Sequence, residues 1–146
     1  MVRSLIALLL LAGVLSQAGA HADPLITLSE AALPPAPARL LTRGISRGPA
    51  IKLISPPADT VISSPFNLKL SFEARGGEKI DPGSVTMVYL KSPMVDLTPR
   101  LKSAITSSGI DLPKADVPPG DHSIEVTVKD GAGRETQSVI KLMVAK

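Results

Sequence analysis

Two histidines are the residues of this chain best suited to chemistry, because an imidazole binds metals and transfers protons near neutral pH. They are His21 and His122, and the chain contains no cysteine. Catalysis by His122 would need an adjacent nucleophile and an orienting acid. The serines follow no nucleophile-elbow pattern, and a single histidine in the domain makes no triad. The sequence therefore predicts a protein that is not an enzyme and that needs no cofactor.

The first twenty-two residues have the pattern of an export signal. Arg3 supplies a positive charge, residues 5–15 form an apolar stretch, and small residues follow. The apolar stretch is shorter than the roughly twenty residues that cross a bilayer, so no transmembrane segment is predicted in the mature chain. Small-x-small sites allow cleavage after Ala20 or after Ala22. The expected location is the periplasm or the outside of the cell.

Cleavage after Ala20 would create an alternative with metal chemistry. The mature chain would then begin with His21, whose free amine and ring nitrogen chelate a soft-to-borderline metal such as copper. His122 would supply a third nitrogen ligand. Cleavage after Ala22 would remove His21, and the sequence leaves both outcomes open.

The composition excludes two classes of partner. The chain has 16 basic and 13 acidic residues, and it becomes nearly neutral once the signal is removed. Nucleic-acid binders usually carry a denser basic face, so no nucleic-acid partner is predicted. Phe66, Phe72 and Tyr89 are the only aromatic residues besides histidine, and there is no tryptophan. A stacking platform for sugars or bases is therefore not expected.

Residues 23–49 are rich in proline and are predicted to form a flexible linker or docking tail. An apolar segment in this tail is a candidate contact with a partner protein, although a fluctuating apolar tail would give the same pattern. A basic segment is a second candidate contact, and it would also give weak attraction to anionic lipid or cell-wall polymer. The candidate partner-binding residues are Leu25, Ile26, Leu28, Arg39, Arg43 and Arg47.

Residues 50–146 are predicted to fold as one β-domain. Ile124, Val126 and Val128 alternate with polar residues, which is typical of a strand buried on one face. Turn signals flank this strand on both sides. A second strict alternation covers residues 66–74. Every second residue from Phe66 to Ala74 is apolar, and these side chains are expected to face the core.

The remaining segments complete a sandwich of about seven strands. Residues 84–91 are expected to form a central strand after a turn at 80–83, and residues 112–117 an edge strand. The segment from Met94 to Ile110 is either a short helix that begins near Thr98 and Pro99 or a sheet-crossing loop. Short strands without a long helical period predict an all-β, immunoglobulin-like, two-sheet antiparallel sandwich.

The run from Pro119 to Arg134 resembles the turn, penultimate strand and Asp-x-x-Gly hairpin of bacterial immunoglobulin-like domains, which are close to fibronectin type III modules. The resemblance implies a spacer, adhesive module or binding platform in an exported protein. In related sandwiches, the position after such a glycine turn carries an aromatic ring that braces the corner by hydrogen bonding. This implies a structural role for His122.

A second resemblance concerns the loop Ser55-Pro56-Pro57-Ala58-Asp59. It is similar to the first loop of exported copper carriers, which are small immunoglobulin-like proteins with an N-terminal histidine. Here about thirty residues separate His21 from that loop, and no methionine cluster is present. The leading prediction is therefore an exported, non-catalytic module that engages an envelope or secreted partner protein through its tail or an exposed sheet edge. Its oligomeric state stays open.

Overall fold

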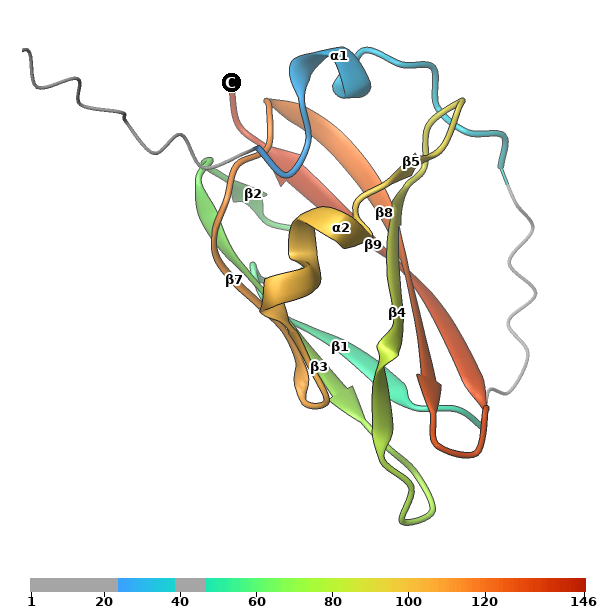
Figure 1. The fold of residues 1–146 in the computed structure, drawn as a ribbon. Coiled ribbons are helices and arrows are strands. Elements are labelled where there is room, and N and C mark those ends of the chain that lie inside the picture. The colour runs from blue at the N-terminus through green and yellow to red at the C-terminus, as the bar shows by residue number, and fades with distance from the viewer. Residues whose placement is uncertain (1–23, 39–46) are drawn as a thin grey trace, which may run out of the picture.

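The protein is described by a computed structural model that places residues 24–38 and 47–146. In these residues, nine strands form one sheet of four and one sheet of five, packed against each other (Figure 1). The all-β sandwich predicted from the sequence is confirmed. About seven strands were expected; three of the nine have only two residues, which is too short for an alternating pattern.

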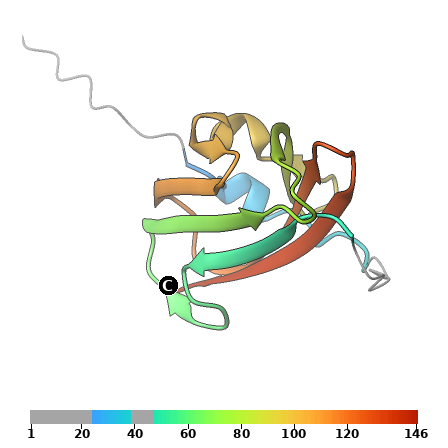
Figure 2. The ribbon, with the colours of Figure 1, turned by 90° about the horizontal axis from the view of Figure 1, so that it is seen from below.

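The four-stranded sheet has the order β1-β3-β7-β6, and all its pairings are antiparallel. Figure 2 shows β1 and β3 side by side in this layer. The bounds are β1 Ala50–Ser55, β3 Phe66–Glu73, β7 Gly109–Ala115 and β6 Ile105–Thr106.

The five-stranded sheet has the order β2-β9-β8-β4-β5. Its pairings are antiparallel except that β2 runs parallel to β9. Strands β1 and β2 therefore follow each other in the chain but belong to different sheets. The bounds are β2 Val61–Ile62, β9 Glu135–Val144, β8 Gly120–Asp130, β4 Ile80–Tyr89 and β5 Val95–Asp96.

The core consists of the inward faces of both sheets, as the alternation predicted. Ile124, Val126 and Val128 of β8 have no exposed surface. The inward residues of β4 are also buried, and those of β3 are buried or half-buried. Burial of alternate side chains on two facing sheets supplies the hydrophobic stabilisation of a chain without disulfides.

The segment between β5 and β6 contains both structures that the sequence left open. It forms α2 (Thr98–Leu101), then the 3-10 helix η1 (Lys102–Ala104), and then the edge strand β6. Leu97 and Leu101 have no exposed surface, so this segment closes one side of the sandwich. The Thr98 hydroxyl does not cap the helix. It accepts a hydrogen bond from Met87 N at 2.9 Å instead.

Two local predictions were wrong. The expected turn at 80–83 is an irregularity inside β4, where the register with β8 shifts between Asp81 and Thr86. The segment expected as an edge strand around Pro113 belongs to β7, which lies between β3 and β6. However, β6 pairs only with the first two residues of β7. Pro113 lies beyond this pairing, so its missing N–H removes no hydrogen bond between β6 and β7.

Residues 24–38 belong to the segment predicted as a flexible linker or docking tail, and they pack on the sandwich. Residues 24–36, here called the strap, cross one end of the molecule and contain α1 (Leu28–Ala31) (Figure 1). Leu25 and Ile26 are only 2% and 1% exposed and belong to the core. They extend the folded unit beyond the predicted boundary at residue 50. None of the helices in the placed residues has the length and apolarity that a membrane crossing needs.

Candidate functional site

A cleft of about 580 Å³ lies at the end of the sandwich that carries the strap. Four separate segments meet there: the start of the strap, the β2–β3 connection, the β7–β8 connection and the residues around the end of β9. We call it the end cleft. It is lined by Pro24, Ile26, Thr27, Leu28, Ser63, Ser64, Asp116, Val117, Pro118, Pro119, Val144, Ala145 and Lys146.

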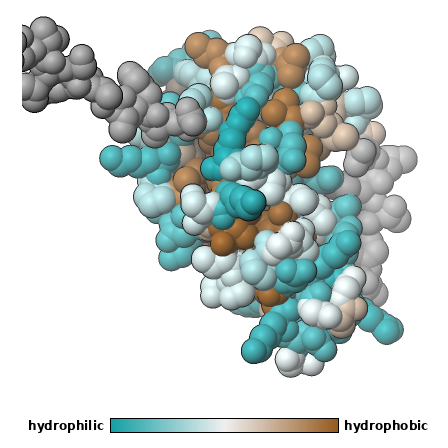
Figure 3. Space-filling view, in the orientation of Figure 1, coloured by the Kyte–Doolittle hydropathy of each residue, from teal (hydrophilic) through white to brown (hydrophobic). Residues whose placement is uncertain are grey.

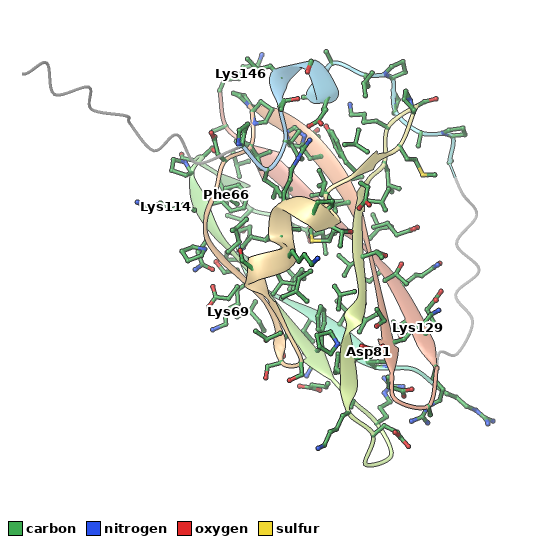
Figure 4. All side chains as sticks on the ribbon, in the orientation of Figure 1. Phe66, Lys69, Asp81, Lys114, Lys129 and Lys146 are labelled. Atoms are coloured by element: carbon green, nitrogen blue, oxygen red, sulfur yellow. The ribbon has the colours of Figure 1, made fainter. Side chains whose placement is uncertain are left out.

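The lining of the end cleft is mostly apolar. Its three prolines, Pro24, Pro118 and Pro119, have no backbone N–H to offer a ligand. Leu28 lies beside them on α1 and is 76% exposed. Figure 3 shows apolar surface at the end of the molecule where α1 lies, and Figure 4 shows Lys146 beside α1. This surface is suited to apolar side chains of a ligand.

A polar network ties the walls of the end cleft together. The Ser64 hydroxyl donates to Asp116 Oδ1 at 3.1 Å and accepts from Val117 N at 3.0 Å. The carbonyl oxygen of Asp116 accepts from the backbone N–H groups of Leu25 and Ile26, at 2.9 and 3.3 Å. These bonds join the β2–β3 connection, the β7–β8 connection and the strap. The cleft is therefore formed before any ligand arrives.

His122 lies behind one wall of the end cleft and is 3% exposed. Its Nε2 lies 2.7 Å from the carbonyl oxygen of Pro118, and its Nδ1 lies 2.8 Å from the Tyr89 hydroxyl. Since a carbonyl oxygen only accepts, Nε2 carries the proton and Nδ1 accepts from Tyr89. Burial lowers the pKa of His122, and the nearby Lys91 ammonium lowers it further, against the opposing effect of the bond to Pro118. The ring is neutral at neutral pH.

This geometry supports the bracing role of His122, while the metal role at His21 and His122 stays a prediction. Both ring nitrogens form hydrogen bonds inside the protein, so a copper ion at this ring would have to displace one of these partners. His21, the other predicted ligand, lies outside the described residues. Within residues 24–38 and 47–146, no three histidine, cysteine or acidic side chains are grouped closely enough to hold a metal ion.

The strap is fixed to the sandwich by Arg100 of α2. The guanidinium donates from Nη2 to Glu30 Oε1 at 2.6 Å and from Nη1 to Glu30 Oε2 at 2.8 Å. Nη1 also donates to the carbonyl oxygen of Leu25 at 2.8 Å. The bond to Arg100 holds the pKa of Glu30 down to about 2, although burial of this carboxyl group acts in the opposite direction. Glu30 is therefore ionised in the folded protein.

Two further contacts hold the strap. Thr27 and Glu30 form a capping box at the start of α1, with Glu30 N donating to Thr27 Oγ1 at 3.2 Å and Thr27 N donating to Glu30 Oε2 at 2.9 Å. Beyond α1, Lys91 Nζ donates to the carbonyl oxygen of Ala31 at 2.9 Å and lies 5.3 Å from the centre of the Tyr89 ring. Lys91 thus connects the strap with the His122–Tyr89 pair.

The structure separates the residues that the sequence grouped as partner-binding. Leu25 and Ile26 are buried in the core, so they are not available to a partner, whereas Leu28 is exposed at the end cleft. Arg47 is exposed, and Arg39 and Arg43 lie outside the described residues. The Thr-x-x-Glu pattern of the capping box was the sequence signal for a folded strap. No local signal predicted the end cleft.

Comparisons with known proteins add the following. No protein-family profile matches the chain, and no curated protein matches it. Among solved structures, the chain is similar to the crystal structure of CopC from Methylosinus trichosporium OB3b, with 16% sequence identity and a TM-score of 0.46. The match covers 66% of this chain and 93% of that chain. A likeness at this level carries no argument about function.

Proposed function

We propose that this chain is an exported, non-catalytic binding module that engages an envelope or secreted partner protein at the end cleft. The observation that carries the proposal is the convergence of donor-free proline walls, an apolar lining and the exposed Leu28 in one pre-formed recess. The export-signal pattern of residues 1–22 supports the location, and the sandwich supplies a rigid platform.

The ligand that fits best is an extended, mainly apolar segment of the partner. Strand β2 is the last strand of its sheet, and the chain runs from β2 directly into Ser63 and Ser64 of the end cleft. Val61 of β2 is 64% exposed. An extended peptide adds to such an edge through its backbone and directs alternate side chains into a neighbouring pocket.

The test places a photoreactive amino acid at Leu28 and at Val61 of the full chain in the cells that make it. Ile54 of β1, which is 51% exposed on the other sheet, is the matched control. Adducts with one exported protein are expected from both cleft positions and not from Ile54. Equal adducts at Ile54, or none at the cleft positions, would contradict the proposal.

A peptide with the sequence of the cross-linked partner segment then gives a quantitative test. Its affinity for the purified chain should fall about tenfold in Leu28→Asp, because one apolar contact worth about 1.5 kcal/mol is lost. Ile54→Asp should bind as the unchanged chain does. The urea unfolding midpoints of the two variants show whether the fold is intact.

A further inference from the structure

The chain that follows α1 carries a proline-rich run that the proposed function does not use. We call it the proline ridge, and it consists of Leu33, Pro34, Pro35, Ala36, Pro37 and Ala38. A proline fixes its own φ at about −65° and restricts the residue before it to extended conformations. The run therefore favours the polyproline II helix, a left-handed helix with about three residues per turn.

The exposure of the side chains along the proline ridge has the period of this helix. Leu33 and Ala36 are half-buried, whereas the residues between and after them are exposed. In a polyproline II helix, residues three positions apart lie on the same face. One face of the ridge therefore rests on the protein, and the two faces that contain all its prolines point into solvent.

Backbone hydrogen bonds hold the proline ridge against the β4–β5 connection, beside which the chain after α1 runs (Figure 1). The carbonyl oxygen of Pro34 accepts from Ser92 N at 2.8 Å, and Ala36 N donates to the carbonyl oxygen of Leu90 at 3.1 Å. Pro35 lies between these two bonds. Because successive residues of an extended chain direct their peptide groups to opposite sides, the carbonyl group of Pro35 points away from the β4–β5 connection.

The three prolines of the ridge offer apolar rings and carbonyl acceptors but no backbone donor, because proline lacks an N–H. A groove lined by aromatic side chains complements such a surface. The flat aromatic rings pack against the proline rings, and Trp N–H or Tyr O–H groups donate to the carbonyl oxygens. Since the ridge is already held in its extended form, it loses little conformational entropy on binding.

We propose that the proline ridge is a second docking surface of this protein, which binds a partner domain whose groove is lined by aromatic side chains. Pro34 and Pro37 form the P-x-x-P pattern that such grooves recognise. At the end cleft this chain supplies the recess, whereas at the ridge it supplies the ligand. The two surfaces share no residue, so this inference does not rest on the proposed function.

The first test places a photoreactive amino acid at Ala38 of the full chain in the cells that make it, which leaves all three prolines in place. Ala58, an exposed alanine between β1 and β2, is the matched control. We expect an adduct from Ala38 with one exported protein, and a cross-linked segment that contains Trp or Tyr. The proposal is overturned by no adduct at Ala38, by the same adduct at Ala58, or by a cross-linked segment without an aromatic residue.

The second test measures the affinity of the purified full chain for the cross-linked partner domain. Pro34→Ala and Pro37→Ala should each weaken binding about tenfold, because each removes two CH₂ groups from the aromatic groove. Pro113→Ala, at an exposed proline of β7, should bind as the unchanged chain does. Equal affinity of all three variants would overturn the proposal, and their urea unfolding midpoints show whether the fold is intact.

A third measurement needs no partner and tests whether the ridge is held in place. The amide of Ala36 should exchange with solvent at least tenfold more slowly in the full chain than in a synthetic peptide of residues 24–38. Equal exchange rates would show that the ridge is not fixed on the sandwich, and would overturn the proposal. Absence of adducts at Leu28 and Val61 would instead overturn only the proposed function.

Discussion

At the scale of single residues, the carboxylate of Asp130 holds the β8–β9 hairpin closed. It is buried and accepts from Ala132 N and Arg134 N, both at 3.0 Å, and from Arg134 Nε at 2.8 Å. Burial acts to raise the pKa of Asp130, but the bonds from Arg134 outweigh it and the pKa lies below the ordinary 3.8. The hairpin is thus stabilised by an ionised side chain.

Asp130→Asn should therefore lower the urea unfolding midpoint at pH 7, because the amide cannot accept all three bonds. The lowered pKa means that the stabilisation is present above pH 3.8 and is lost as the pH falls through the folded value. The difference between variant and unchanged chain should accordingly shrink in strong acid. Asp121→Asn, at an exposed position of the same strand, is the control. Equal midpoints at pH 7 would refute the role of Asp130.

At the scale of elements, the strap contributes two core side chains from outside the predicted domain. Ile26→Ala should cost about 2–5 kcal/mol, as buried aliphatic truncations do. Leu28→Ala should change stability by less than about 0.5 kcal/mol, because Leu28 is 76% exposed. The two residues are both apolar and stand two positions apart, so the sequence does not rank them. Urea unfolding of both variants measures the contrast, and similar losses would show that the strap is not packed as described.

The Arg100–Glu30 ion pair is a second contact of the strap, and its contribution to stability can be measured. Its side chains are 31% and 18% exposed, so solvent screens part of the attraction. A double-mutant cycle with Arg100→Gln and Glu30→Gln should give a coupling energy of about 1 kcal/mol at pH 7.

The pH dependence of this coupling follows from the pKa of Glu30, which is about 2 in the folded protein against an ordinary 4.5. The stabilisation is complete above pH 4.5 and declines as the pH falls towards about 2. High salt should reduce the coupling at pH 7. A coupling that is independent of both pH and salt would indicate a packing effect rather than an ion pair.

At the scale of the whole molecule, the folded unit includes the strap. A chain that begins at Arg47 lacks Leu25 and Ile26, and should lose about 3–6 kcal/mol relative to a chain that begins at Pro24. The vacated site at the end of the sandwich should also bind a hydrophobic dye. Urea unfolding and dye fluorescence of the two chains show where the folded domain begins. Equal stability of the two chains would show that the folded domain begins near residue 50, as the sequence predicted.

The sequence by itself determined the sandwich and the inward face of its long strands. Alternation is a local property, because each side chain of a strand points opposite to its neighbour. Val126 and Leu70 could therefore be assigned to the core from their own segments, and both are buried. The Thr27–Glu30 capping box is equally local, but the apolar residues around it also fit a tail near a chain terminus.

Only the tertiary structure decided which residues meet at the ends of the strands. The end cleft joins residues from Pro24 to Lys146, and His122 meets Tyr89 from a position 33 residues away. Such long-range contacts depend on sheet order and register, and no short-range sequence pattern encodes them. The same holds for Leu25 and Ile26, whose burial requires a site that the folded sandwich creates at its end. Local periodicity fixes which face of a strand is buried, whereas long-range packing fixes which segments share a site.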